Sequence, residues 1–205
     1  MLKQTFTQLA LSYSENEILI EEFWIEIETH YSGKERYYHS LRHLEHLLEQ
    51  LTTIKTELKD WNTILFTLFY HDVIYNALKS DNEEKSAELA EKRMKQLGIP
   101  LELIERCKEQ ILATKSHVKS ENDDTNYFTD ADLSVLGQNW EIYSAYFKNV
   151  RQEYAIYPDL VYNPGRKNVL LHFLAMDRIF KTDYFFEKYE KPARENLRKE
   201  AELLA

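Results

Sequence analysis

The chain has 205 residues, a length that suits one domain and is enough to bury a core without disulfides or a structural metal. Its net charge of −9 repels nucleic-acid backbones, so we expect no nucleic-acid polymer as a partner, whereas a small phosphorylated ligand needs only a few local cations. Cys107 is the only cysteine, the first residues lack the features of a signal peptide, and the longest apolar stretch is too short to span a bilayer. We therefore expect a cytoplasmic protein with no membrane segment.

Helix-favouring composition runs through the whole chain, because only 4 Gly and 4 Pro interrupt stretches rich in Leu, Glu, Lys and Ala. No strand alternation of useful length occurs, so we predict an all-α fold in a single domain over residues 1–205. The periodic segments predict helices near residues 2–12, 15–31, 37–57, 61–78, 82–97, 101–115, 129–157 with a break near Gly137, and 164–203 with a break near Asp183. Residues 116–126 are expected to form a loop, and the Asn163-Pro164-Gly165 turn is expected to separate two late helices.

Three histidines fall within the predicted helix 37–57. His39, His43 and His46 follow the spacing i, i+4 and i+7, which places them on one helix face. The row runs beside a leucine-rich face that is expected to pack on the core. We therefore favour a histidine row that points into a cleft over a solvated polar edge.

A His-Asp doublet, His71-Asp72, lies in the predicted helix 61–78. The residues around it are apolar nearly all round the helix, which is typical of a central, buried helix. Burying a histidine beside an aspartate is costly unless both side chains are satisfied. A divalent cation satisfies both, and so does a hydrogen-bonded His–Asp pair, and this segment alone does not choose between them.

Two acids, Asp130 and Asp132, flank a small residue where the helix 129–157 is expected to begin. The helix macrodipole favours acids in a first turn, which explains both residues without any function. Candidates for neutralising a phosphate are Arg42, Lys115, His117 and Arg166, although each also fits an ordinary surface or paired cation. Glu83 and Glu84 fit capping and surface positions better than catalytic ones.

Taken together, these clusters resemble the HD superfamily of metal-dependent phosphohydrolases, whose ligands follow the order H…HD…D on an all-helical bundle. In this chain His43, the doublet His71-Asp72 and then Asp132 follow that order. The segment YHSLRH, residues 38–43, is also similar to the YHxxxH of cyclic-nucleotide phosphodiesterases, in which the second His binds metal and the first donates a proton to the leaving group. The resemblance implies that these four residues bind a metal, that His39 and Asp72 are catalytic, and that Asp132 is the ligand rather than Asp130.

The similarity extends beyond the ligands to a family of bacterial predicted HD phosphohydrolases. It covers roughly residues 36–200, in the stretches RYYHSLRH, HDVIYN, NEEKSAELA, ILATKSH, DADLSVLG, VRQEY and PGRKNVL. The chain is much shorter than the cyclic-nucleotide enzymes and lacks an obvious second set of histidines. This departure argues against a two-metal mechanism and against a cyclic-nucleotide substrate.

The resemblance implies an HD-domain-like helical bundle that hydrolyses a phosphate ester of a nucleotide or small phosphorylated metabolite with a metal-activated water. Two imidazoles and two carboxylates suit Mn²⁺, Fe²⁺, Co²⁺, Ni²⁺ or Zn²⁺ better than Mg²⁺, and the sequence does not choose among these ions. Two alternatives remain open: an HD-fold diiron oxygenase, and a non-catalytic metal-containing module that binds a nucleotide or a protein partner. The aromatic residues Tyr184, Phe185, Phe186 and Tyr189 can either line a homodimer interface or pack within the chain.

Overall fold

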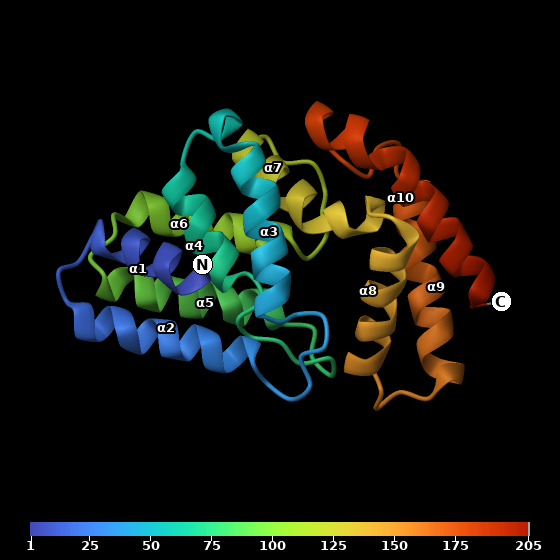
Figure 1. Ribbon diagram of the computed structural model, residues 1–205, viewed down its shortest axis with the longest axis horizontal. Coiled ribbons are helices and arrows are strands. Elements are labelled where there is room, and N and C mark those ends of the chain that lie inside the picture. Colours follow the sequence, from blue (N-terminus) through green and yellow to red (C-terminus); the bar gives the residue numbers. More distant parts are fainter. Residues whose placement is uncertain (205) are drawn as a thin grey trace. The chain divides into compact units, whose positions relative to one another are not determined.

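Helices make up all the regular structure of the computed structural model, which describes residues 1–204 (Figure 1). The helices are α1 (Leu2–Leu11), α2 (Glu17–Tyr31), α3 (Leu41–Thr53), α4 (Trp61–Tyr70), α5 (Asn82–Gln96), α6 (Leu101–Ala113), α7 (Asp123–Leu133), α8 (Trp140–Glu153), α9 (Asp159–Ala175) and α10 (Asp183–Leu203), with 3₁₀ turns η1 (Lys55–Glu57) and η2 (Ser134–Gly137). Since no strand occurs among the described residues, the prediction of an all-α fold is confirmed. Within the same residues, none of the helices combines the length and the apolarity that a membrane crossing requires.

The Cα positions divide the chain into two compact units, Met1–Thr129 and the part that begins at Asp130. In the first unit α4 is the central helix, and it packs against α1, α3, α5 and α6 (Figure 1). Every residue of α4 from Thr63 to Tyr70 is buried, as its apolar sequence predicts. Aromatic rings fill the space around it: Phe6 of α1 meets Phe69 edge-on, with 5.1 Å between ring centroids.

The central helix α4 ends at Tyr70, so the prediction of a helix over 61–78 is wrong at its C-terminal end. Side chains from other elements take over the backbone groups that a longer helix would have paired. The amide of Asp72 donates to the Tyr31 hydroxyl at 3.2 Å, and the amide of Ile74 donates to Ser86 Oγ at 3.1 Å. His71-Asp72 therefore lies at the end of a buried helix rather than in its middle.

Two other helix starts differ from their predictions. α3 begins at Leu41, which leaves His39 outside the helix and makes the shared helix face of His39, His43 and His46 wrong for its first member. α7 begins at Asp123, inside the stretch expected to be a loop. The Asp124 carboxylate accepts the amide protons of residues 59 and 60, each at 2.9 Å, and this tertiary contact holds the first turn of α7 in place.

The second unit contains η2, α8, α9 and α10, and α10 packs against both η2 and α9. Phe185 and Tyr189 of α10 are buried and stack in one aromatic cluster with Phe180, so these two rings serve packing within the chain. The expected break near Gly137 is confirmed, because η2 separates α7 from α8.

The expected turn at Asn163-Pro164-Gly165 is wrong, because Pro164 lies inside α9. A proline cannot donate to the carbonyl four residues earlier, which here belongs to Leu160 in the first turn of the helix. Leu160 is 90% exposed, so water can solvate the carbonyl that the proline leaves without a donor. The helix therefore tolerates a residue that usually marks its end.

We expect Cys107 to resist alkylation in the folded protein. Its side chain is fully buried in α6, and burial raises the pKa of its thiol to about 12, so almost no thiolate forms at pH 8. Mass spectrometry after iodoacetamide treatment at pH 8 should show modification only when denaturant is present, with free N-acetylcysteine as the reactive control. Complete labelling within minutes in the absence of denaturant would contradict the buried position.

We expect the Gly137→Ala substitution to destabilise the second unit by about 2 kcal/mol, since overpacking a filled site typically costs 1–3 kcal/mol. A Cβ at Gly137 would lie 2.6 Å from Tyr189 Cβ and 2.8 Å from the Tyr189 carbonyl oxygen. Gly165→Ala in α9 is the matched control, because no atom lies within 4 Å of its added Cβ. Helix propensity should make that variant more stable by up to ~1 kcal/mol. Chemical denaturation of both variants checks the pair, and equal midpoints would contradict it.

Candidate metal centre

Two buried histidines face each other through their Nε2 atoms. His43 lies in the first turns of α3 and His71 directly after α4, and their Nε2 atoms are 3.1 Å apart. The Nδ1 atom of His71 is 3.0 Å from the carbonyl oxygen of Leu68, to which it donates its proton. That bond leaves the lone pair of His71 Nε2 directed at His43, which is the arrangement that a metal-binding histidine needs.

Asp72 brings a carboxylate to the same point. Its Oδ2 atom is 3.2 Å from His71 Nε2 and 3.8 Å from His43 Nε2. The side chains of the two histidines are 0% and 2% exposed, whereas that of Asp72 is 20% exposed. Among these three side chains, that of Asp72 is the one most accessible to solvent.

His39 reaches the cluster from the segment before α3, although it is not part of that helix. Its Nε2 atom is 3.9 Å from Asp72 Oδ2, and its side chain is also 20% exposed. The imidazole stacks on the ring of Tyr75, with 4.2 Å between centroids and 28° between planes. The stacked ring orients His39 on the open side of the two buried histidines.

The two candidate aspartates of α7 have different partners. Asp130 is fully buried, and its carboxylate accepts the amide protons of Lys181 and Thr182 at 3.0 and 2.7 Å and the Thr182 hydroxyl proton at 2.8 Å. Lys181 Nζ lies 3.3 Å from the same carboxylate. Burial raises the pKa of Asp130 and lowers the pKa of Lys181, and each charge opposes the shift of the other. Asp130 thus has a structural role in the second unit.

Asp132 is the aspartate of α7 that belongs to a group of possible metal ligands. His43, His71 and Asp132 each offer one ligand atom, and these atoms lie within 4.8 Å of one another, so the group can hold a metal ion. The boundary between the two units falls inside α7, after Thr129, and the last turn of this continuous helix carries Asp132.

The donor set fits a divalent transition metal. It contains two imidazole nitrogens, one of them with its tautomer fixed by a backbone carbonyl, and the carboxylate of Asp72 beside them. Nitrogen and oxygen donors of this kind bind Mn²⁺, Fe²⁺, Co²⁺, Ni²⁺ and Zn²⁺. Without a metal, a proton on His43 Nε2 can be donated to the free lone pair of His71 Nε2, so the short Nε2–Nε2 distance is compatible with both forms.

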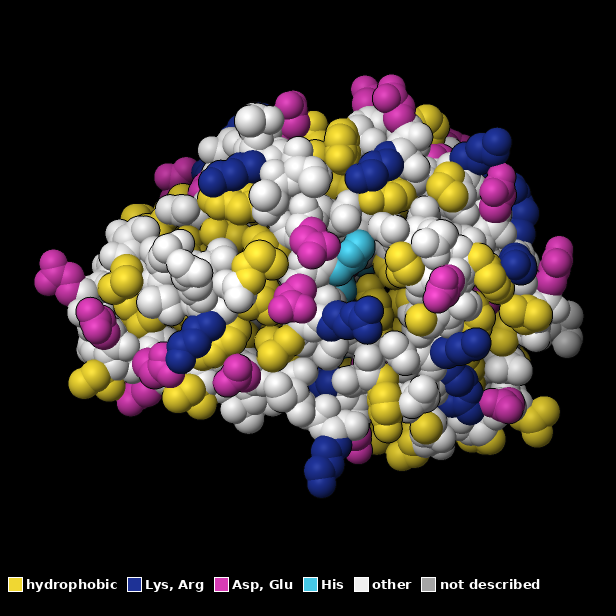
Figure 2. All heavy atoms as spheres, viewed as in Figure 1, with side chains coloured by type: hydrophobic (Ala, Val, Ile, Leu, Met, Phe, Trp, Pro, Cys, Tyr) yellow, Lys and Arg dark blue, Asp and Glu magenta, His cyan; other side chains and the backbone are white. Residues whose placement is uncertain are grey.

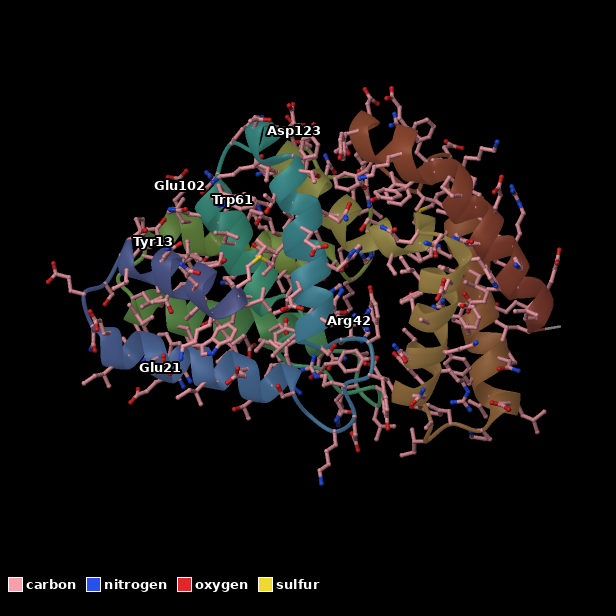
Figure 3. All side chains as sticks on the ribbon, viewed as in Figure 1. Tyr13, Glu21, Arg42, Trp61, Glu102 and Asp123 are labelled. Atoms are coloured by element: carbon pink, nitrogen blue, oxygen red, sulfur yellow. The ribbon has the colours of Figure 1, made fainter. Side chains whose placement is uncertain are left out.

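Two of the residues expected to bind phosphate, Arg42 and Lys115, have different surroundings. Arg42 is exposed in the first turn of α3, beside His43, and is labelled in Figure 3. Lys115 donates to the Ser80 carbonyl at 2.6 Å and pairs with the Glu84 carboxylate at 2.5 Å, and Glu83 lies 3.8 Å from the same ammonium. Arg42 is therefore the candidate closest in the chain to a metal-site residue, while the charge of Lys115 is already compensated.

The remaining two candidates stay predictions. His117 lies four residues after the last residue of α6 and has a positive φ of 52°. Arg166 is buried in the second unit, where its guanidinium makes two bonds to Glu200, of 2.7 and 3.0 Å. These bonds give Arg166 a structural partner. Figure 2 shows basic and acidic side chains interspersed among neutral ones on the visible face.

Arg36 lies near the site, although no motif in the sequence points to a role for it. Its guanidinium donates to the carbonyl oxygens of His39 (3.1 Å), Asp72 (2.7 Å) and Val73 (2.8 Å). The only signal in the sequence is its position three residues before a candidate catalytic histidine. Backbone carbonyls are its partners, and no pattern of side chains can reveal such contacts.

Comparison of the chain with protein-family models, with curated proteins and with solved structures finds no match. The resemblance to the HD superfamily therefore rests on the residues of this chain alone, and function has to be argued from the geometry of the histidine–aspartate cluster.

We expect Asp130→Asn and Asp132→Asn to change different properties of the protein, the first its stability and the second its metal binding. Asp130→Asn leaves the buried Lys181 without its charged partner and should cost about 3 kcal/mol or more. Asp132→Asn should leave the stability almost unchanged and weaken Co²⁺ binding at least tenfold. Chemical denaturation and Co²⁺ titration of both variants check this. Normal Co²⁺ affinity in Asp132→Asn would show that Asp132 is not a ligand.

Proposed function

We propose that this protein is a metal-dependent hydrolase that cleaves a phosphate ester in a nucleotide or another small phosphorylated metabolite. The observation that carries the proposal is the convergence of His43 Nε2 and His71 Nε2, 3.1 Å apart, beside the Asp72 carboxylate. The order of these residues and of Asp132 in the chain adds the resemblance to the HD superfamily. We name Asp132 as the fourth ligand.

The proposed metal is a divalent transition ion, for which Mn²⁺, Fe²⁺, Co²⁺, Ni²⁺ and Zn²⁺ are the best candidates. Bound there, it would supply a water of lowered pKa and a Lewis acid for a phosphoryl oxygen. His43 and His71 hold their Nε2 lone pairs in the buried part of the cluster, and the carbonyl of Leu68 fixes the tautomer of His71. The ligand side chains are thus oriented before any substrate binds.

His39 is suited to act as the general acid. It lies on the open side of the cluster, with Nε2 3.9 Å from Asp72 Oδ2, and the unperturbed pKa of an imidazole is close to neutral. A protonated ring at this position can pass its proton to the leaving oxygen of the ester. Asp72 therefore has two roles in the proposal, as a ligand and as the carboxylate that lies beside His39. Arg42, exposed beside His43, is the most accessible cation for a substrate phosphate.

We expect metal-loaded protein to hydrolyse at least one member of a panel of nucleoside phosphates, sugar phosphates and nitrophenyl phosphate esters. His43→Ala should abolish both metal binding and turnover, because it removes a buried ligand. His172→Ala, a change at an exposed histidine of α9, is the matched control and should leave both unchanged. A panel with no hydrolysed member under any of the five metals, or full activity in His43→Ala, would overturn the proposal.

The general-acid role of His39 makes a separate prediction about leaving groups. His39→Asn should keep the metal and lower kcat by about 10²–10⁴ for an ester with an alkoxide leaving group, which needs a proton. The same variant should lose much less activity on a nitrophenyl ester, whose leaving group departs as the anion. Steady-state kinetics on the two substrates checks this, and equal losses on both would contradict proton donation by His39.

A further inference from the structure

One guanidinium connects the two chain segments that contain His39 and Asp72, the partly exposed residues of the site. Arg36 lies between α2 and α3, in the same segment as His39. Its Nη1 atom donates to the carbonyl oxygens of His39 and Asp72, at 3.1 and 2.7 Å, and its Nη2 atom donates to that of Val73 at 2.8 Å. A single side chain therefore bonds the backbone of the candidate general acid and the backbone of the His-Asp doublet.

Two tyrosine rings hold this guanidinium in place. Its carbon atom Cζ lies 5.1 Å from the ring centroid of Tyr31 and 5.2 Å from that of Tyr75, within the range of cation–π attraction. Both rings also contact the site segments: the Tyr31 hydroxyl accepts the amide proton of Asp72, and Tyr75 stacks on His39. The planar group is thus restrained by the same residues that it helps to position.

We propose that Arg36 is a positioning residue of the metal centre. It links the segment of His39 to the residues that follow α4, and it donates to the carbonyls of Asp72 and Val73, which a longer helix would have paired. This inference rests on the proposed function. A lysine cannot replace the arginine fully, because an ammonium lacks the planar fork that serves three carbonyls in fixed directions.

Arg93 provides a matched control in the same unit. It is also half-buried, its guanidinium forms two bonds to the Glu26 carboxylate at 2.8 and 2.6 Å, and it lies 5.0 Å from the ring centroid of Phe23. It therefore shares with Arg36 the forked bonding, the ring contact and the link between two elements. None of these partners is a residue of the metal site. Loss of Arg93 therefore measures how much stability the protein loses when such an arginine is removed away from the site.

The test compares Co²⁺ binding and thermal denaturation in Arg36→Met, Arg36→Lys and Arg93→Met. Arg36→Met should weaken Co²⁺ binding by about 10–100-fold, the usual effect of losing a group that orients ligands, and should change the visible absorption bands of the saturated protein. Arg36→Lys should restore part of the affinity. Arg93→Met should lower the melting temperature comparably and leave the Co²⁺ affinity and the bands unchanged.

Three results would overturn the inference. The first is unchanged Co²⁺ affinity and unchanged absorption bands in Arg36→Met. The second is a loss of Co²⁺ affinity in Arg93→Met as large as that in Arg36→Met, and the third concerns the unmodified protein. Absence of Co²⁺ binding by the unmodified protein would overturn the proposed function as well, which distinguishes the two failures. If Arg36→Met does not fold, Arg36→Lys against Arg93→Lys makes the same comparison.

Discussion

The structure of the candidate site depends on how α4 ends inside the protein. When a buried helix stops, the backbone groups that follow it no longer have helical partners and need others. Here Arg36 bonds the carbonyls of Asp72 and Val73, and Tyr31 and Ser86 accept the amide protons of Asp72 and Ile74. The chain can then turn directly after Tyr70, and the turn places His71 and Asp72 next to each other with their side chains directed at His43. A continued helix would separate two adjacent side chains by about 100° around its axis.

This arrangement divides the cluster into a rigid part and an accessible part. The two histidines are buried and have their orientation set by helices and by a backbone carbonyl, while Asp72 and His39 remain partly exposed. Metal binding needs fixed ligands, and catalysis needs access for a substrate and a proton donor. The contacts of Arg36 join the two segments of the accessible part, because its carbonyl partners include those of His39 and Asp72.

Much of the fold could be predicted from the sequence, because composition and periodicity report helices directly. The errors occur where tertiary contacts override local preference. α4 stops early because side chains from elsewhere satisfy residues 72–74, and α7 starts early because Asp124 binds the amides of residues 59 and 60. The helical alignment of His39 with His43 was wrong, yet His39 still reaches the cluster, since stacking on Tyr75 and the bond from Arg36 bring it there. The periodicity of a sequence does not report such tertiary contacts.

The choice between Asp130 and Asp132 shows the same limit at the scale of one residue. Two positions along a helix rotate a side chain by about 200°, so the two carboxylates point to nearly opposite sides of α7. Their chemistry is identical, and only the neighbours of each side distinguish them. Asp130 accepts the amide protons of Lys181 and Thr182, and Asp132 is a possible metal ligand together with the two histidines. Two aspartates of one helix therefore differ in role because different neighbours surround them: Asp130 satisfies buried backbone amides, and Asp132 is the candidate ligand.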